Sequence, residues 1–328
     1  MEVLSTSDVD LRRAATSLAA GFLVAFPTET VYGLGADAFN PVSIAKIFEA
    51  KQRPTFDPLI IHIAERDAVF RITDRSSMNE TMLERLSALA GRFWPGPLTV
   101  ILPKRREIPN IATAGLDTVA VRFPSHPAAQ ALIRYSTGAV AAPSANPFGC
   151  LSPTRAEHVK SQLGDRVDFI IDGGKTEVGL ESTILDITAD SPAILRLGGI
   201  PGEDIEALIG PVVLSLQSSP GAPHSPGQLK SHYAPGTPLV LCRQGELDAI
   251  PPEPGEGRLY FSRAKNPRIA PDRIRVLSES ADLVEAAANL FDMLHELDNL
   301  GLSLIRAEEA PTSSLGAAIN DRLRRASS

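Results

Sequence analysis

The chain has 328 residues, of which 43% are hydrophobic and 22% charged, a balance typical of folded globular proteins and a length that accommodates two domains. This composition excludes a disordered chain, and no apolar run approaches the roughly 18–20 residues that a membrane span needs. The formal net charge of −7, from 32 basic and 39 acidic residues, argues against a protein that binds nucleic acid by bulk positive charge.

Short apolar runs alternate with segments of helical period over the first two hundred residues. The runs are rich in β-branched residues and bounded by Gly, Pro or Asp, which predicts strands at residues 23–27, 59–63, 98–102, 119–123, 139–142, 168–172, 182–187 and 194–197. Helices are predicted between them, at residues 43–50, 79–90, 127–135 and 154–163. We expect the last helix to begin with a capping box made by Thr154 and Glu157. So many strands with interleaved helices predict a large α/β or α+β domain with a twisted mixed sheet over residues 8–210.

A segment dense in Pro, Gly and Ser follows, and we expect residues 211–238 to form a linker. A stretch of this length without regular structure is often functional. Beyond it, strands are predicted at residues 239–242, 259–262, 274–277 and 302–306, and helices at residues 282–300 and 313–325. They predict a small, Rossmann-like, three-layer α/β domain over residues 239–328.

Cysteine usage and the first residues bear on the cellular compartment. The two cysteines, Cys150 and Cys242, are too few for a disulfide framework, and neither has a second Cys or a His at zinc-ligand spacing. The N-terminal stretch carries acids where a secretory signal has bases, and no apolar core follows. We therefore expect a cytoplasmic protein with no structural metal and no membrane contact.

Two short strings resemble nucleotide-binding motifs but lack their defining residues. Residues 174–176 look like the end of a P-loop, but Phe169 stands where that motif needs its first Gly. Residues 33–38 match GxGxxA, but no acidic residue follows a second strand at the ribose-binding distance. The chain has no GxSxG elbow, no HExxH helix and no pair of carboxylates in a catalytic-looking context. Covalent catalysis is therefore not expected, and any chemistry would depend on positioning and charge.

Polar side chains gather at the ends of the predicted strands. The first strand runs into a Gly-rich turn with Thr28 and Thr30, which suits a small-ligand pocket but equally a structural turn. Lys51 and Arg53 lie ahead of Pro54, which disfavours helix at Arg53. Two cations there would either flank a polyphosphate or simply face solvent.

Two predicted strands are interrupted by a basic or titratable residue. His62 lies inside an apolar strand, where a lone histidine is more often a hydrogen-bonded core group than a ligand contact. Arg122 needs an anionic partner, and a ligand carboxylate and an internal Asp or Glu are both candidates. Further strand ends carry polar residues, and the N-terminus of the helix near residue 154 favours anions; these residues are Ser144, Asn146, Ser152, Ser182 and Arg196. The basic cluster of residues 104–106 is interpreted as a solvated loop, with RNA phosphates as the alternative.

Six strings, in this order, carry a family resemblance: PTETVYGLG, KQRP with PLIIH, FWPGPLTVIL, VAVRFPSHP, APSAN with SPT, and GLESTILD. They resemble the YrdC domain over roughly residues 8–205. The phrase SPG with HYAP, followed by a small α/β domain, resembles the longer two-domain form of the L-threonylcarbamoyladenylate synthase family. The resemblance implies an adenylate-forming nucleotidyltransferase that converts L-threonine, bicarbonate or CO2, and ATP into threonylcarbamoyl-AMP and pyrophosphate. The product would pass to a tRNA-modifying threonylcarbamoyl transferase complex, which makes N6-threonylcarbamoyladenosine next to the anticodon.

The resemblance also implies site residues by motif position. L-threonine is placed against Thr30, His62, Arg122, Ser182 and the backbone of Ala142, with Arg122 on the substrate carboxylate. ATP is placed against Arg53, Asp57, Thr118, Ser144, Asn146, Ser152, Arg196 and Tyr233. Lys51 and Arg53 are expected to act on the carbamate and the phosphates, and Mg2+ is expected to arrive with ATP rather than on direct protein ligands. Asp57 departs from the family, which usually has Asn there, and an acid near a triphosphate repels it unless it meets Mg2+ or a base.

Two other functions are consistent with the same fold. A non-catalytic YrdC-like module would bind RNA, which the acidic balance of the chain disfavours, although a weak tRNA contact remains an option. A carbamoyl-transfer subunit for metal-centre assembly has zinc-finger and acylphosphatase segments with no counterpart here. If Tyr233 reaches the nucleotide, residues 215–238 would form a lid that excludes water from the pocket.

Overall fold

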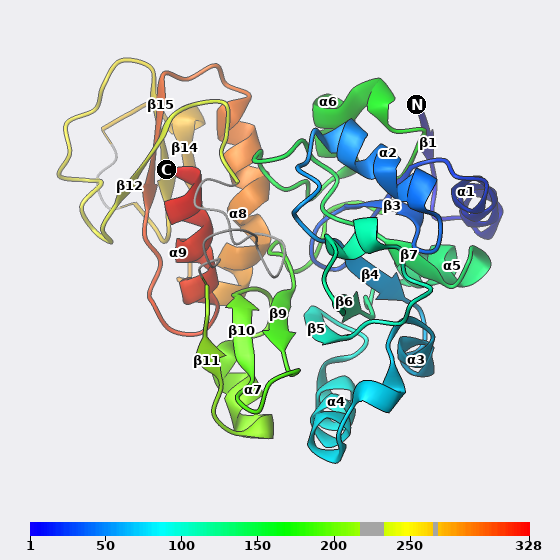
Figure 1. Ribbon diagram of the computed structural model, residues 1–328. Coiled ribbons are helices and arrows are strands. Elements are labelled where there is room, and N and C mark those ends of the chain that lie inside the picture. The colour runs from blue at the N-terminus through cyan, green and yellow to red at the C-terminus, as the bar shows by residue number, and fades with distance from the viewer. Residues whose placement is uncertain (217–232, 265–267) are drawn as a thin grey trace.

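The computed structural model describes residues 1–216, 233–264 and 268–328, which form one large and one small β-sheet (Figure 1). The large sheet has the strand order β1-β8-β2-β3-β7-β4-β6-β5-β9-β10-β11. Its strands are β1 (Glu2–Leu4), β2 (Val24–Phe26), β3 (Gly33–Asp37), β4 (Ile60–Ile63), β5 (Leu98–Pro103), β6 (Thr118–Arg122), β7 (Ala139–Ala141), β8 (Phe169–Ile171), β9 (Thr183–Asp186), β10 (Ala193–Arg196) and β11 (Val213–Leu214). The pairing is mixed: β4 runs parallel to β6 but antiparallel to β7.

Helices cover both faces of the large sheet. They are α1 (Asp8–Ala19), α2 (Pro41–Lys51), α3 (Val69–Ile72), α4 (Glu80–Phe93), α5 (Pro127–Tyr135), α6 (Ala156–Leu163) and α7 (Gly202–Ile209). Side chains alternate along β2, so Val24 and Phe26 join the core under α1 and α5, whereas Ala25 joins the core under α2, α4 and α6. Because both faces are buried, the central strands are mostly apolar, with His62 in β4 and Thr99 in β5 as exceptions, and other polar residues concentrate where the strands end.

The predicted strands and helices of the first two hundred residues are present, with ends that shift by a few residues. The capping box is wrong: α6 begins at Ala156 after Arg155, whose side chain caps nothing, and Thr154 contacts the Nδ1 atom of His158 instead. Several elements were not predicted, namely β1, β3, β11, α1, α3 and α7. β3 is Gly-rich because a Cβ at Gly35 would lie 2.9 Å from both Phe26 and Val140, so the close strand packing needs glycine.

The small sheet is entirely parallel in the described residues, with the order β12-β15-β13-β14. Its elements are β12 (Leu239–Cys242), β13 (Glu256–Tyr260), β14 (Ile274–Val276), α8 (Leu283–Asp298), β15 (Leu304–Glu308) and α9 (Leu315–Ala326). α8 and α9 pack on the face of this sheet that is directed toward the large domain (Figure 1). Leu247 and Ile250 pack on the opposite face, so the third layer is a loop rather than a helix.

The two domains share a buried apolar contact. Val31 and Leu180 of the large domain belong to the same cluster as residues of α8 and α9. Gly179 has φ +71°, and a Cβ there would lie 2.4 Å from the carbonyl oxygen of Ala287 in α8. Only glycine therefore permits the large domain to approach the α8 backbone this closely.

Part of the predicted linker lies outside the described residues. Residues 217–232 include the SPG phrase and His232, so a lid over residues 215–238 stays a prediction. Val213 and Leu214, which the linker was expected to contain, form β11 and pair with β10. Among the described helices, none is long and apolar enough to cross a membrane.

Candidate functional site

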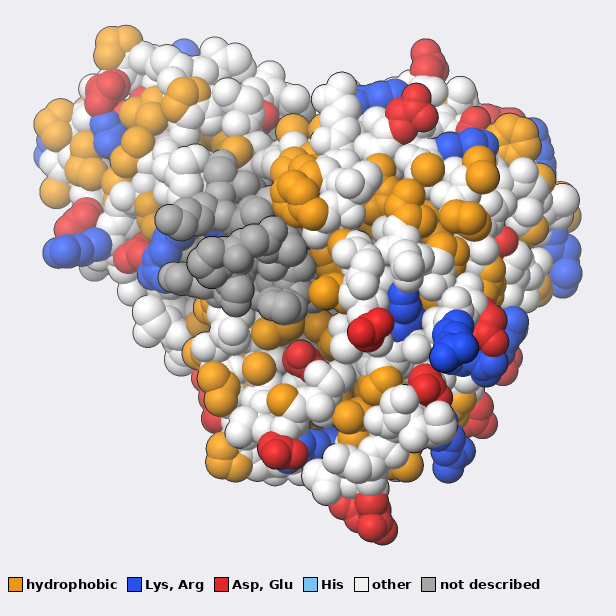
Figure 2. Space-filling view, viewed as in Figure 1, with side chains coloured by type: hydrophobic (Ala, Val, Ile, Leu, Met, Phe, Trp, Pro, Cys, Tyr) orange, Lys and Arg blue, Asp and Glu red, His pale blue; other side chains and the backbone are white. Residues whose placement is uncertain are grey.

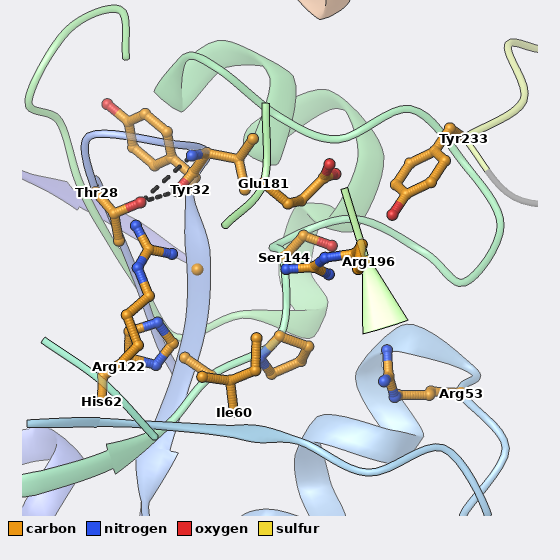
Figure 3. A pocket seen from close by; sticks show the side chains of 14 residues that line it. Thr28, Tyr32, Arg53, Ile60, His62, Arg122, Ser144, Glu181, Arg196 and Tyr233 are labelled. Carbon is orange, nitrogen blue, oxygen red and sulfur yellow. Dashed lines mark hydrogen bonds between the residues drawn. The ribbon is translucent and has the colours of Figure 1, made fainter. Parts of the chain in front are cut away.

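A cavity with about 540 Å3 of unfilled space, part of it open to solvent, lies where several strands of the large sheet end (Figure 3). It is lined by Thr28, Val31, Tyr32, Gly33, Arg53, Ile60, His62, Arg122, Ala142, Pro143, Ser144, Glu181, Arg196 and Tyr233. His62 and Arg122 lie on one side, Arg53 and Arg196 on the other, with Ser144 between them (Figure 3). Residues far apart in the sequence therefore converge on one space.

Arg122 is held at one end of the cavity by an internal carboxylate. Its Nη2 atom lies 2.8 Å from Glu29 Oε1 and also donates to Thr30 Oγ1 at 2.8 Å. The second carboxylate oxygen of Glu29 accepts from the backbone N–H of Ser125 at 3.1 Å. Of the two candidate partners for Arg122, the internal acid is thus present in the structure. The buried Nε atom of Arg122 has no hydrogen-bond partner among the described residues, so a donor remains for a ligand.

His62 lies beside Arg122 because β4 and β6 run parallel and these two residues are register partners. Burial, followed by the positive charge of Arg122, lowers the pKa of His62 to about 3. The ring is therefore neutral at physiological pH. In the part of the chain that the structure describes, the buried Nδ1 atom of His62 has no hydrogen-bond partner. The His62 and Phe26 rings are nearly perpendicular, with 6.2 Å between the ring centroids.

Arg196 is fixed at the opposite side of the cavity by Ser182. The Arg196 Nε atom donates to the Ser182 carbonyl oxygen, and Nη2 donates to Ser182 Oγ, both at 3.0 Å. Ser182 Oγ also shares a hydrogen bond of 2.7 Å with Thr99 Oγ1. Ser182 does not itself line the cavity; it orients the guanidinium that does.

Lys51 and Arg53, the two predicted catalytic cations, occupy different positions. Arg53 lines the cavity, with Nη2 2.9 Å from Asp57 Oδ2. Nη2 also donates to the Pro58 carbonyl oxygen at 2.9 Å, and Nε donates to the Asp57 carbonyl oxygen at 3.2 Å. Lys51 is fully buried outside the lining, where its ammonium donates to the carbonyl oxygens of Ser144, at 2.6 Å, and Asn146. Lys51 thus fixes the loop that presents Ser144 to the cavity.

Asp57 is the departure noted in the sequence, and it meets a base. It is only 1% exposed and pairs with Arg53. Burial raises the pKa of Asp57, an effect that the charges of Arg53 and Lys51 oppose. Burial likewise lowers the pKa of Arg53 and of Lys51. This side of the cavity is therefore a desolvated cluster of cations with one internal acid.

The remaining predicted site residues divide into those near the cavity and one away from it. Thr30 and Ser152 each contact a lining residue: Thr30 accepts from Arg122, and Ser152 donates to Glu181. Asn146 accepts from Lys51, which also donates to the lining residue Ser144. Ala142 and Tyr233 line the cavity. Thr118 begins β6, at the far end of the strand from Arg122, and does not line it.

The basic cluster of residues 104–106 borders a surface hollow together with residues 70 and 73–76, and this hollow shares no lining residue with the cavity. Figure 2 shows Lys and Arg side chains beside acidic ones on the part of the surface where α3 lies in Figure 1. Lys104 donates to Asn110 Oδ1 at 2.7 Å, and Arg105 pairs with Glu107 at 2.7 Å. Internal partners thus satisfy two of the three side chains, consistent with a solvated loop. Binding of RNA phosphates here stays a prediction.

Comparisons with known proteins identify the family. Residues 16–198 match the family model Sua5_yciO_yrdC, described as "Telomere recombination", and residues 200–328 match "Threonylcarbamoyl-AMP synthase, C-terminal domain". The chain is 43% identical to the threonylcarbamoyl-AMP synthase of Bacillus subtilis (strain 168), over 98% of this chain and 94% of that protein. The chain belongs to the threonylcarbamoyl-AMP synthase family. It is also 40% identical to the relative of the same name from Pyrococcus abyssi (strain GE5 / Orsay), over 97% of this chain and 94% of the relative.

A solved structure extends this relationship to the whole fold. The structure titled "Crystal structure of P. abyssi Sua5 complexed with L-threonine" matches with a TM-score of 0.90 and 39% identity, covering 100% of this chain and 98% of that chain. The predicted family resemblance and the predicted fold, a large mixed-sheet domain with a second small α/β domain, are confirmed. The comparisons support an enzyme of the threonylcarbamoyl-AMP synthase family and not the RNA-binding module.

Three charged residues of the site were missed by sequence reasoning. Glu29 and Glu181 are buried at the cavity, each paired with an arginine, and the partner of Glu181 is Arg322 in α9. The two acids do not form a pair of carboxylates, because they lie at the ends of different strands. Each pairs instead with an arginine from a distant segment of the chain. The only available signal was that an acid in each of two apolar motifs, PTETVYG and GLESTILD, requires a counter-charge when buried.

Proposed function

We propose that this chain joins L-threonine, bicarbonate or CO2, and ATP into threonylcarbamoyl-AMP with release of pyrophosphate. One observation carries the proposal: guanidinium groups from distant segments face each other across one cavity, with Arg122 at one side and Arg53 and Arg196 at the other. Such a cavity has separate ends for a carboxylate and for a polyphosphate.

The Arg122 end suits the amino acid. The unpartnered Nε atom of Arg122 and the unpartnered Nδ1 atom of neutral His62 provide polar contacts in an otherwise desolvated place. Val31 and Ile60 add apolar surface for a methyl group. L-threonine presents a carboxylate, a hydroxyl and a methyl group, and the solved structure of the Pyrococcus abyssi relative is titled as a complex with L-threonine. We assign the threonine site to this end.

The opposite end suits ATP. Burial lowers the pKa values of Arg53, Arg196 and Lys51, which means that their charges are costly in the empty site. A polyphosphate would supply the missing negative charge. The Tyr233 ring lines the same end (Figure 3) and offers an aromatic surface to the nucleotide.

The proposed reaction requires two anions to meet. The threonine amine adds to CO2 and loses a proton, which forms a carbamate; a carbamate oxygen then attacks the α-phosphorus of ATP. The bond from that phosphorus to the bridging oxygen breaks, and pyrophosphate leaves with the electron pair. No protein nucleophile is needed, because fixed guanidinium groups and hydroxyls orient both anions and stabilise the charge as it moves.

We propose that Mg2+ enters with ATP. In the described ranges no group of three or more His, Cys, Asp or Glu side chains is arranged to hold a metal, and the carboxylates of Glu29, Asp57 and Glu181 each contact a guanidinium. This donor set fits a metal carried on the phosphates, where it would neutralise the leaving pyrophosphate. Arg53 and Arg196 would then hold the nucleotide itself.

The product is a mixed anhydride that water hydrolyses, so a second enzyme must consume it promptly. We propose that a tRNA-modifying threonylcarbamoyl transferase complex accepts it to form N6-threonylcarbamoyladenosine next to the anticodon. The cytoplasm, where tRNA is modified, is the compartment that the low cysteine count favours.

A pyrophosphate-release assay with omissions tests the proposed function. Pyrophosphate should form only when L-threonine, bicarbonate and ATP are all present, and replacing Arg122 or Arg196 with Ala should abolish it. Matched replacement of the surface residue Arg106 with Ala should leave the rate unchanged. Salt-dependent binding of tRNA without any pyrophosphate would instead favour the non-catalytic module.

A further inference from the structure

Arg322 of α9 is a buried arginine that the small domain contributes to the surroundings of the cavity. Its side chain is only 1% exposed, although it belongs to the last helix of the chain. Its Nε atom lies 2.8 Å from Glu181 Oε2, and its Nη2 atom donates to the carbonyl oxygen of Leu197 at 2.6 Å. Glu181 lines the cavity, and Leu197 directly follows the lining residue Arg196. One guanidinium thus joins two separate strand ends of the large domain.

The same guanidinium also covers an aromatic ring. Its Cζ atom lies 4.8 Å from the centroid of the Tyr233 ring. Phe291 of α8 also contacts that ring, with 5.7 Å between the ring centroids. Tyr233 is 1% exposed and lines the cavity. A desolvated guanidinium over an aromatic face is an attractive contact. Arg322 therefore helps to determine where the Tyr233 ring lies.

Tyr233 needs such support because of its backbone. The backbone φ angle of Tyr233 is +66°, in the left-handed region that residues other than glycine rarely adopt. A residue in this conformation persists only when its surroundings hold it. The described contacts of the ring with Arg322 and Phe291 come from the two helices of the small domain. The small domain thus sets the placement of a cavity residue.

Other contacts join the domains without touching the cavity. Asp292 of α8 lies 2.7 Å from Arg155 and 2.8 Å from Lys175, both in the large domain. None of these three residues lines the cavity. Attachment of the small domain therefore does not depend on Arg322 alone. Experiments can thus distinguish the attachment of this domain from the positioning of the Tyr233 ring.

We propose that Arg322 is a positioning residue through which the small domain sets the geometry of the nucleotide end of the cavity. It acts on the nucleotide through Tyr233 and Glu181, and it lies behind them rather than against the ligand. The proposal rests on the proposed function for its assignment of this end of the cavity to ATP.

The test compares R322M and R322K with two control variants. R324A removes an exposed arginine of the same helix, and R155A removes one partner of the remote interdomain pair. ATP binding without L-threonine, L-threonine binding without ATP, and pyrophosphate release are measured for each protein, together with the unfolding temperature. R322M should weaken ATP binding and raise the KM for ATP by about tenfold or more, while L-threonine affinity stays within about threefold. R322K should fall between R322M and the wild type, since it keeps the charge but loses the planar fork.

Three results would overturn the proposal. The first is ATP binding by R322M that equals that of the wild type. The second is an equal weakening of ATP binding and of L-threonine binding in R322M. The third is an ATP defect in R155A as large as that in R322M, which would reduce Arg322 to an interface contact. If R322M does not fold, E181Q/R322M removes the uncompensated carboxylate and is compared with E181Q, which lacks the same charge. The double variant should bind ATP more weakly than E181Q, and equal ATP binding by the two would refute the positioning role. Wild-type protein that binds ATP but releases no pyrophosphate would refute the proposed function and leave the Arg322 comparison intact.

Discussion

The guanidinium of Arg122 lies 2.8 Å from the carboxylate of Glu29, and both side chains are only 4% exposed. Glu29 therefore compensates the charge of Arg122 within the fold. The proposed function puts a substrate carboxylate at the Nε edge of Arg122, where it would share this guanidinium with Glu29. We therefore expect the ion pair both to stabilise the fold and to compete with the substrate.

Replacing Glu29 with Gln should separate these two effects. The amide keeps the shape and a hydrogen-bond acceptor but removes the charge, so the variant should lose about 3 kcal/mol of unfolding free energy. L-threonine should bind it more tightly than the wild type, because the carboxylate of the substrate becomes the main counter-charge of Arg122. Urea unfolding and calorimetric titration measure both quantities. The control is Glu107→Gln, in the exposed pair with Arg105, which should change neither. Weaker threonine binding in Glu29→Gln would contradict the competition.

The neutral state of His62 should appear in the pH dependence of stability. The pKa of His62 is about 3 in the folded protein, whereas the pKa of a histidine in the unfolded chain is about 6.5. Below that pH the unfolded chain takes up a proton that the folded chain does not, so stability is full above about pH 6.5 and falls as the pH drops. Well below about pH 6.5, His62 contributes about 1.4 kcal/mol per pH unit to the change of the unfolding free energy with pH. Unfolding free energies of the wild type and His62→Gln, measured between about pH 6.5 and 5, should differ in slope by nearly one proton. Equal slopes would show that His62 is protonated in the fold.

Lys51 offers a test between two roles. The structure places its ammonium on the carbonyl oxygens of Ser144 and Asn146, so Lys51→Met should cost about 2–4 kcal/mol of stability as well as activity. The sequence-based prediction, that Lys51 acts on the carbamate and phosphates, requires a loss of activity without that loss of stability. Thermal unfolding and pyrophosphate release on the same preparation distinguish the two. Lys46→Met, at the more exposed lysine of the same helix that donates to Gly21, is the matched control.

Asp57→Asn should improve ATP binding. Asp57 holds Arg53 by an ion pair and places a negative charge beside the proposed phosphate site. The amide removes this repulsion and frees Arg53, so the KM for ATP should fall by about threefold to tenfold, with the KM for L-threonine unchanged. Steady-state kinetics with each substrate varied in turn measures the effect. A higher KM for ATP would mean that the ion pair is needed to aim Arg53, or that Asp57 contacts the magnesium on the phosphates.

Much of the large sheet could be predicted because its strands are short, β-branched and apolar on both faces, and such runs stand out between Gly and Pro. The strand β3 could not, since its sequence, GLGAD, has the composition of a turn; its glycines are needed for packing against Phe26, which only the tertiary structure reveals. Likewise, the capping box at Thr154 matched a local pattern, but α6 begins two residues later, at Ala156, and Thr154 contacts His158 in the first turn of the helix.

The candidate site shows the same division. The sequence led to residues that line the cavity, because Arg53 and Arg122 lie in the recognisable strings KQRP and VAVRFPSHP, and Arg196 ends the strand β10. The partners that hold them in place could not be predicted, since Glu29 meets Arg122, and Glu181 meets Arg322, only after distant segments fold together. The chemistry of a site is thus more readable from local sequence than the ion pairs that support it.

Under the proposed function, one cavity joins an amino acid to a nucleotide through a carbamate. The decisive experiment is mass spectrometry of the reaction with isotopically labelled bicarbonate. A threonylcarbamoyl-AMP adduct that carries the labelled carbon should form in a one-to-one ratio with pyrophosphate, and it should be absent with Arg122→Ala. An adenylate without the label, or pyrophosphate released in the absence of L-threonine, would refute the proposed function.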